Sequence, residues 1–375
     1  MSAAWLLSQH EVWARCDAVI TSEATLELLA AVADTPAPSG SSSLTRGPKI
    51  RAWCDKQGML ERGATLRLDA FRSGCDLLAF GDGGLRMLAH LDEVSYLVEG
   101  PDANRGCWRI APYCYHLAEQ PAPARVIRFE SDGNWQQVCA GDVSQHGNRY
   151  VFETGTDVLL APGDRIALAS DVCYDPGSGV VTGSLDNAAG TTSALLAAAV
   201  LSDLGIPFSL ALTDEEEGPS GSASQTISRG ASRLLRHLDD APLSVAIDIH
   251  GVPDPDADAA QAHRVPWGAS LAEFSSHGRG SVAPPHLFAG VRDLLCGLQE
   301  RGLAVRQNVG GYVPRSDDVV AMTHSNRIVI LGYPGANRHF DRGLPTVNLQ
   351  DLMHLARALV MLAVAVDGEQ LAVNW

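Results

Sequence analysis

The chain has 375 residues, of which 46% are hydrophobic and 19% are charged, a balance that predicts a globular protein with a sizeable core. Its formal net charge of −16, without any run of Lys or Arg, argues against binding to nucleic acid. The eight cysteines form no C-x-x-C pair, and we find no signal peptide and no apolar run long enough to cross a bilayer, so we expect a cytoplasmic protein with reduced thiols and no membrane partner.

The first half of the chain contains predicted helices followed by predicted β-strands. Leu, Trp and Val recur at roughly helical spacing over 5–33, which predicts one or two helices, and TPAPSGSSS at 35–43 predicts a loop. The run at 85–98 predicts a buried strand followed by a second strand-like run. Between 99 and 172, short β-type runs alternate with Gly, Asp, Asn and Pro, the pattern of a small all-β module.

The pattern returns to alternating strands and helices after Gly183. We expect helices at 187–204, 285–302 and 349–367, and strands at 208–213, 243–249 and 327–333. Together these elements predict an α/β fold with a mixed sheet flanked by helices. Because the β module interrupts this layer, we predict a discontinuous catalytic domain at 1–98 and 173–375, with an inserted β-barrel-like domain at 99–172.

Acidic and histidine residues stand at the ends of the predicted strands, where open α/β sheets place their ligand sites. Taken alone, each of these residues has a structural explanation that requires no metal, since an Asp before a helix is usually an N-cap and a Glu run is usually solvated. Two divalent cations, however, need a bridging carboxylate, further His and carboxylate ligands, and one position for water. The predicted set is Asp186 as the bridge, with His90, Glu216, Asp248 and His339 as the other ligands.

The acidic run 214–217 leaves the identity of the general base open by one residue. Glu215 can stay free of metal beside the ligand Glu216, and it can then move a proton between water and a leaving amine. The pair can also be Glu216 and Glu217, although the spacing to Gly218 and Gly221 favours the earlier pair.

Residues beside the predicted ligands have candidate supporting roles. Asp92 lies two residues after His90 on an extended chain, so it can accept the second ring N–H of that histidine, or it is simply a surface residue at a strand end. Gly190 allows close packing at the start of the helix after Asp186, and Asn187 is a candidate helix cap.

Six segments resemble, in order, the motifs of the tetrahedral aminopeptidase family, which includes glutamyl and deblocking aminopeptidases. They are APSG (37–40), AHLDEVSYLV (89–98), GSLDNAAG, EEEG (215–218) with Gly221, AIDI and PGANRH (334–339). The resemblance implies that His90 and Asp248 bind one metal, Glu216 and His339 bind the other, Asp186 bridges them, and Glu215 is the base. It also implies a zinc-exopeptidase-like fold and two zinc ions, with cobalt or manganese as alternatives. The implied activity is removal of N-terminal residues from peptides, and the implied assembly, from a dimer to a dodecamer, forms through the β module.

The segments that are expected to contact the substrate differ from the family pattern. Pro-Arg-Ser-Asp at 314–317 stands where the family has Gly-Thr-Asp, which makes Arg315 and Asp317 candidate substrate residues together with Arg338. A guanidinium can hold a carboxylate through two parallel hydrogen bonds. An alternative function is therefore a small-molecule amidohydrolase, such as a deacylase or a dipeptidase for an unusual amino acid. A non-catalytic member of the family is a third hypothesis.

Overall fold

The computed structural model describes residues 3–102, 106–113, 121–147, 149–218, 227–252 and 266–371. Its helices are α1 (Ala3–Leu7), α2 (His10–Val19), α3 (Ser22–Ala33), α4 (Ser42–Lys56), α5 (Ala188–Leu204), α6 (Arg229–Leu235), α7 (Pro285–Cys296), α8 (Asp317–His324) and α9 (Leu349–Asp367), with 3-10 turns η1 (Ala70–Arg72), η2 (Ser276–Gly278) and η3 (Gln299–Arg301). Its strands are β1 (Thr65–Arg67), β2 (Asp76–Phe80), β3 (Leu85–His90), β4 (Ser95–Asp102), β5 (Cys107–Pro112), β6 (Ala122–Phe129), β7 (Trp135–His146), β8 (Arg149–Glu153), β9 (Arg165–Leu168), β10 (Cys173–Asp175), β11 (Val180–Thr182), β12 (Phe208–Thr213), β13 (Leu243–Ala246), β14 (Ile249–His250), β15 (Ala269–Ala272), β16 (Val305–Gln307), β17 (Ile328–Ala336) and β18 (Thr346–Asn348).

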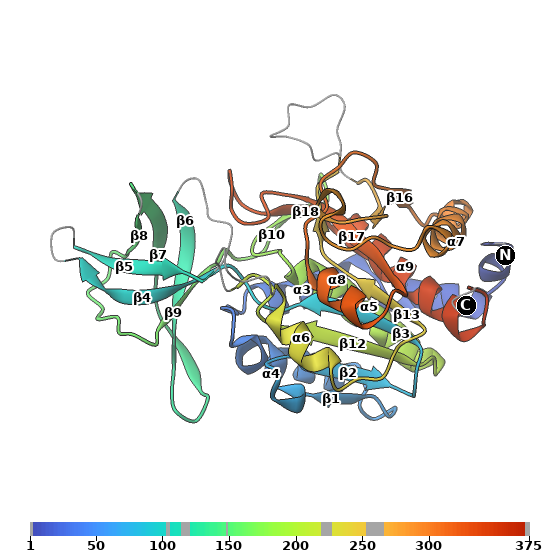
Figure 1. The fold of residues 1–375 in the computed structure, drawn as a ribbon, viewed down its shortest axis with the longest axis horizontal. Coiled ribbons are helices and arrows are strands. Elements are labelled where there is room, and N and C mark those ends of the chain that lie inside the picture. Colours follow the sequence, from blue (N-terminus) through green and yellow to red (C-terminus); the bar gives the residue numbers. More distant parts are fainter. Residues whose placement is uncertain are drawn as a thin grey trace.

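A large mixed sheet flanked by helices forms the main body, and a small barrel projects from one side of it (Figure 1). The sheet has the path β1-β2-β12-β3-β13-β17-β18-β11-β10. Strands β12, β3, β13 and β17 run parallel to one another, whereas β2, β15 and β18 pair antiparallel with their neighbours. The predicted fold class is therefore confirmed, and the four parallel strands end at the same edge of the sheet.

Two long apolar helices, α5 and α9, pack against each other in the main core. Helix α5 ends at Leu204 and is capped by Gly205, whose positive φ of 71° suits a left-handed cap. At the start of α9, the side chain of Asn348 accepts a hydrogen bond from the N–H of Gln350. By length and composition α9 could cross a membrane, but 83% of its most apolar window is buried inside the protein. Helix α9 is therefore placed as a core helix.

The predicted elements and the observed ones differ at several points. The helix expected at 285–302 ends at Cys296, because Gly297 caps it, and continues only as the short turn η3. Helix α4 and strands β1 and β2 were not predicted, because α4 carries Gly47 and Pro48 in its interior and β1 and β2 are short. The helices expected at 187–204 and 349–367 are confirmed.

The barrel closes in the order β4-β5-β8-β7-β6-β9 around its own apolar core. Tyr96, Phe152 and Ile166 are fully buried in that core. Phe340, from the segment after β17, packs into the same cluster, so the main body contributes a side chain to the barrel. Strand β4 begins at Ser95, within the stretch assigned to the first part of the catalytic domain, and the domain division at 98 and 173 itself stays a prediction.

Candidate metal centre

The ends of the four parallel strands carry the residues expected to bind metal. His90 is the last residue of β3, and Asp248 follows β13 by two residues. The acidic run follows Thr213 at the end of β12, and His339 follows β17. Asp186 comes from the segment that leads into α5, so the fold brings together residues that lie up to 249 positions apart in the chain (339 − 90 = 249).

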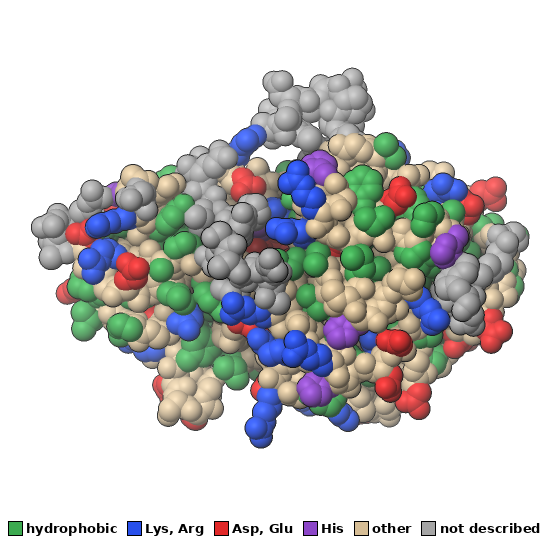
Figure 2. Space-filling model, viewed as in Figure 1, with side chains coloured by type: hydrophobic (Ala, Val, Ile, Leu, Met, Phe, Trp, Pro, Cys, Tyr) green, Lys and Arg blue, Asp and Glu red, His purple; other side chains and the backbone are tan. Residues whose placement is uncertain are grey.

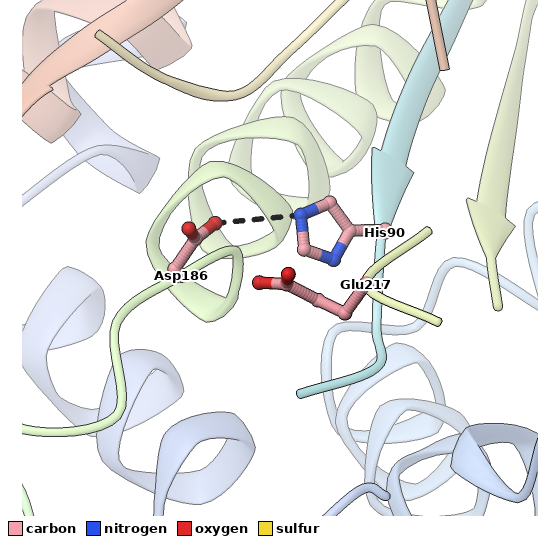
Figure 3. Close-up of side chains that lie close together, drawn as sticks. All are labelled: His90, Asp186 and Glu217. Carbon is pink, nitrogen blue, oxygen red and sulfur yellow. Dashed lines mark ion pairs between the residues drawn. The ribbon is translucent and has the colours of Figure 1, made fainter. Parts of the chain in front are cut away.

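Asp186 stands between the two histidines. Its Oδ1 lies 3.4 Å from Nε2 of His90, and its Oδ2 lies 3.4 Å from Nε2 of His339. The carboxylate of Asp248 approaches Nε2 of His90 to 3.8 Å, and Oε1 of Glu217 approaches Nε2 of His339 to 3.0 Å. Figure 3 shows His90, Asp186 and Glu217 turned toward a common point, and one potential ligand atom from each lies within 4.8 Å of the others.

The three glutamates of the acidic run point in different directions. Glu215 accepts a hydrogen bond from the Tyr113 hydroxyl (2.8 Å) and pairs with Arg233 of α6 through its other oxygen. Oε2 of Glu216 lies 3.8 Å from Nε2 of His90, and Glu217 reaches His339. The carboxylates that approach the histidines are therefore those of Glu216 and Glu217, whereas Glu215 is held by the barrel and by α6.

Asp92 is fully buried and ties this acidic run to the N-terminal part of the chain. Its carboxylate accepts the backbone N–H groups of Glu216 and Glu217 (3.1 Å each) and the hydroxyl of Ser39 (2.6 Å). Nδ1 of His90 lies 3.1 Å from the Asp92 carbonyl oxygen and 3.6 Å from its carboxylate. Asp92 thus orients the imidazole and fixes the backbone of the acidic run at the same time.

The start of α5 is fixed by contacts across the sheet. Asn187 makes no capping hydrogen bond with its side chain, contrary to the expectation. Its amide instead donates to the carbonyl of Ile247 (2.6 Å) and accepts from the Tyr333 hydroxyl (3.1 Å). A Cβ on Gly190 would lie 2.1 Å from Asn187 Oδ1, which confirms that close packing requires glycine there.

Glycine is also required directly after the acidic run. A Cβ on Gly218 would lie 2.1 Å from the carbonyl oxygen of Tyr113, which follows β5 of the barrel. This close approach places the Tyr113 hydroxyl on Glu215. The second glycine of the expected motif, Gly221, lies outside the described residues.

Burial and mutual charge shift the ionisation of this cluster strongly. Burial lowers the pKa of His339, but Glu217 and Asp186 together outweigh burial and raise that pKa to about 9. Burial also raises the pKa of Asp248, with Asp186 adding to it, to about 6. Burial also raises the pKa of Asp186, but the two histidines outweigh burial and hold that pKa well below its usual range. Cationic histidines therefore balance the carboxylates, which is the charge balance that divalent cations provide.

The donor set fits divalent cations of the first transition row. Imidazole nitrogens and carboxylate oxygens are the ligands that zinc takes in catalytic sites. Oδ1 of Asp186 is buried and makes no hydrogen bond to any described residue, so it is a polar atom with capacity for a ligand. A cavity of about 10 Å³, lined in part by Asp186, Glu217 and Arg338, lies beside it, which is roughly the space of one water-sized sphere.

The three candidate substrate residues occupy different environments. Asp317, the first residue of α8, is buried, and burial raises its pKa to about 6. Its Oδ2 accepts the Thr213 hydroxyl, while its Oδ1 makes no hydrogen bond among the described residues. Arg338 is half-buried beside the carboxylates of the cluster, whereas Arg315 is exposed and pairs with none of the described carboxylates.

Sequence reasoning missed Tyr113, Arg233 and the part played by Ser39. Ser39 lies within the APSG segment at 37–40, but no local pattern marks Tyr113 or Arg233, and none of the three stands at the end of a strand that leads into the cluster. Arg233 belongs to a group of basic residues on and after α6, with Arg229 and Arg236, and Figure 2 shows Lys and Arg side chains gathered over this helix. Arg233 pairs with Glu215, on a chain whose formal net charge is −16.

Solved structures of aminopeptidases share this fold. A TET aminopeptidase from a marine-sediment thaumarchaeon is 16% identical, with 93% of this chain and 98% of that chain covered and a TM-score of 0.70. An aminopeptidase from the archaeon Desulfurococcus kamchatkensis is 16% identical over 91% and 95% of the two chains, with a TM-score of 0.69. The TET1 peptidase of Pyrococcus horikoshii, which can assemble into a tetrahedron or a large octahedral shell, is 18% identical over 90% and 99%, with a TM-score of 0.66.

The comparisons by sequence found no match. No protein-family model matches the chain, and no curated protein matches it. The likeness to the aminopeptidases therefore concerns the fold.

Proposed function

We propose that the protein is a metal-dependent aminopeptidase that removes N-terminal residues from peptides. The observation that carries the proposal is the meeting of two histidines with four carboxylates at the ends of parallel strands, in a fold that solved aminopeptidases share. In this proposal Asp186 bridges two divalent cations, most simply zinc, with cobalt and manganese as alternatives. His90 and Asp248 hold one cation, and Glu217 and His339 hold the other.

For the general base we propose Glu216, the second of the two registers that the sequence allows. Glu215 is a poor candidate because Tyr113 and Arg233 occupy its two oxygens. Glu216 lies beside His90, and burial raises the pKa of its carboxyl well above the usual value, as suits a proton carrier.

A pair of divalent cations, when bound, polarises the scissile carbonyl and makes water more acidic. Glu216 accepts one proton from the attacking water as its oxygen bonds to the carbonyl carbon. The same carboxyl then donates that proton to the departing nitrogen, so the C–N bond breaks and a free amine leaves.

Asp92 is proposed as a positioning residue. By accepting two consecutive backbone N–H groups, it fixes the direction in which Glu216 and Glu217 leave the backbone. Its contact with His90 fixes the tautomer of that imidazole, with Nε2 left for a metal. These contacts support a role that acts through neighbouring residues and not through the substrate.

Self-association is a further part of the proposal. The P. horikoshii TET1 peptidase, which shares the fold, can assemble into a tetrahedron or an octahedral shell. We expect this chain to form a closed homo-oligomer with the barrel at a subunit interface, and light scattering after size-exclusion chromatography tests it. A mass of one chain would contradict this expectation. The predicted cytoplasmic location stays a prediction.

A substrate panel tests the proposed activity. The panel contains aminoacyl anilides, peptides of two to ten residues and N-acyl amino acids, each assayed with added zinc, cobalt or manganese. We expect release of the first residue from free N-termini and no cleavage of N-acetylated peptides. Cleavage confined to N-acyl amino acids would overturn the aminopeptidase proposal and favour a deacylase, the alternative that no specific contact of the structure supports.

A further inference from the structure

Arg338 stands at the edge of the carboxylate cluster, directly before the proposed ligand His339. Its side chain is half-buried, and its guanidinium carbon lies 6.0 Å from the centre of the Tyr312 ring. The guanidinium is charged at all ordinary pH values, and the carboxylates of Asp186, Glu217 and Asp248 lie near it. Arg338 also lines the small cavity beside Asp186 and Glu217. The cation is therefore next to the proposed reaction centre and partly open to solvent.

The guanidinium of Arg338 makes no hydrogen bond and no ion pair with any described residue. Among the described residues, the buried Arg46 is paired with Glu93 and the half-buried Arg233 is paired with Glu215. A guanidinium carries five N–H donors, and leaving them without acceptors in a half-buried position is unfavourable. Two of those donors, side by side, match the two oxygens of a carboxylate.

Charge neutralisation strengthens the case for a ligand on Arg338. The negative charges nearest to it belong to Asp186, Glu217 and Asp248, which are the residues proposed to hold the divalent cations. Divalent cations held by those carboxylates would neutralise them, and the positive charge of Arg338 would then need another counter-charge. An anion that arrives with the substrate supplies one.

We propose that Arg338 binds a carboxylate of the substrate, held at the edge of the Tyr312 ring, so that preferred peptides carry a carboxylate close to the bond that is cut. This inference rests on the proposed function, because it assigns the substrate class of the same site. The Tyr312 ring packs against the His277 ring (5.4 Å between centroids), which holds it in place beside Arg338. Tyr312 is 43% exposed, so a ligand can reach it.

A carboxylate at this position has two sources. An acidic first residue carries one on its side chain, and a dipeptide carries one at its C-terminus. Two pairs of substrates separate them: the p-nitroanilides of Glu and Gln, and Ala-Ala against Ala-Ala amide. Within each pair the two members differ in charge and hardly in size.

The metal-loaded protein is assayed with both pairs, as wild type and as Arg338→Gln and Arg338→Lys. We expect the wild type to prefer the charged member of one pair, chiefly through KM. Arg338→Gln should lower kcat/KM for that member by about 10- to 100-fold, the range for a charge-assisted hydrogen bond, and leave the neutral member within about threefold. Arg338→Lys should fall between, because an ammonium keeps the charge and loses the planar pair of donors.

The matched control is Arg301→Gln, in which another arginine, placed over the Trp13 ring and bonded to His10, is removed from a different part of the fold. This control variant should leave kcat/KM unchanged for both members of both substrate pairs. An equal loss for charged and neutral members in Arg338→Gln would overturn the inference and give Arg338 a purely structural role. A wild type with no preference in either pair would overturn it as well.

Binding measured by calorimetry keeps the inference separate from the proposed function. Glutamate and glutamine are titrated into metal-loaded protein, as are Ala-Ala and its amide into the Glu216→Gln variant. Carboxylate-dependent binding that disappears in Arg338→Gln supports the inference even if no peptide is cleaved, in which case the aminopeptidase proposal alone fails. Binding that ignores the carboxylate overturns the inference even if peptides are cleaved.

Discussion

Oε1 of Glu217 lies 3.0 Å from Nε2 of His339, the shortest of the distances between acidic and imidazole groups in the described part of the cluster. We therefore expect Glu217→Gln to lose the metal that these two residues hold, because an amide oxygen is neutral and a weaker ligand. Metal analysis should find about one fewer zinc per chain than in the wild type. Glu27→Gln, at an exposed glutamate paired with Lys56, is the control and should keep the wild-type metal content.

The neighbouring glutamates allow a matched test of the general base. Glu216→Gln should keep both metals and lower kcat by about 10²- to 10⁴-fold, because it removes only the proton carrier. Glu215→Gln should reduce kcat far less, since its carboxylate contacts Tyr113 and Arg233. The opposite ranking of the two variants would restore Glu215 as the base.

We expect Asp92 to affect activity by orienting neighbouring residues. In Asp92→Asn one side-chain oxygen is replaced by an NH₂ group, which cannot accept the backbone N–H of Glu216 or Glu217. We expect metal affinity or kcat to fall by about 10- to 100-fold, the range for residues that orient ligands, with an unchanged circular dichroism spectrum. Ser39→Ala removes only one of the hydrogen bonds to Asp92 and should have the smaller effect.

The ion pair between Arg46 and Glu93 is a structural element beside the site. Both side chains are buried, and Arg46 also donates to the carbonyl oxygens of Thr35 and Leu91, while Glu93 accepts from the N–H of Ala37. Arg46→Met should lower the free energy of unfolding by about 3–5 kcal/mol, because it leaves a buried carboxylate without its partner.

The double variant Arg46→Met with Glu93→Met distinguishes pairing from packing. Because it removes both buried charges, we expect it to unfold at a higher urea concentration than Arg46→Met alone. If the two losses simply add, the pair contributes through packing and not through charge.

Asp76 gives the fold a dependence on pH away from the proposed centre. It is fully buried on β2, and burial raises its pKa to about 7, although hydrogen bonds from Ser43 and the N–H of Asp69 act against burial. The pKa of Asp76 in the folded protein lies above the ordinary value of 3.8, so the folded state holds this proton more tightly than the unfolded state does. The resulting stabilisation is fully present below pH 3.8 and is lost as the pH rises from 3.8 through about 7.

Asp76→Asn removes this titration. Between pH 4 and pH 8 the free energy of unfolding of the wild type should fall relative to Asp76→Asn by on the order of 1–4 kcal/mol. Urea midpoints of both proteins at the two pH values measure the change. A difference between them that stays constant with pH would contradict the shifted pKa.

Much of the layered fold could be predicted because hydrophobic patterns are local. The apolar runs that became α5, α9, β12, β13 and β17 are long or β-rich enough to specify their own structure, and their alternation specifies the class. Helix α4 escaped prediction because Gly47 and Pro48 lower its intrinsic propensity, so tertiary packing of residues such as Ile50 and Trp53 stabilises it.

The sequence by itself determined which residue types meet at the strand ends, because parallel strands in one sheet finish at one edge whatever the loops do. It placed His90, Asp186, Asp248 and His339 there from spacing and flanking residues. The direction of each glutamate in a run of three was decided only by the tertiary structure. Backbone N–H groups held by Asp92, and side-chain contacts from the barrel and α6, turn Glu215 away and turn Glu216 and Glu217 inward. The contacts of Asp92 and Tyr113 join residues more than 100 positions apart, the contact of Arg233 joins residues 18 positions apart, and no local pattern encodes them.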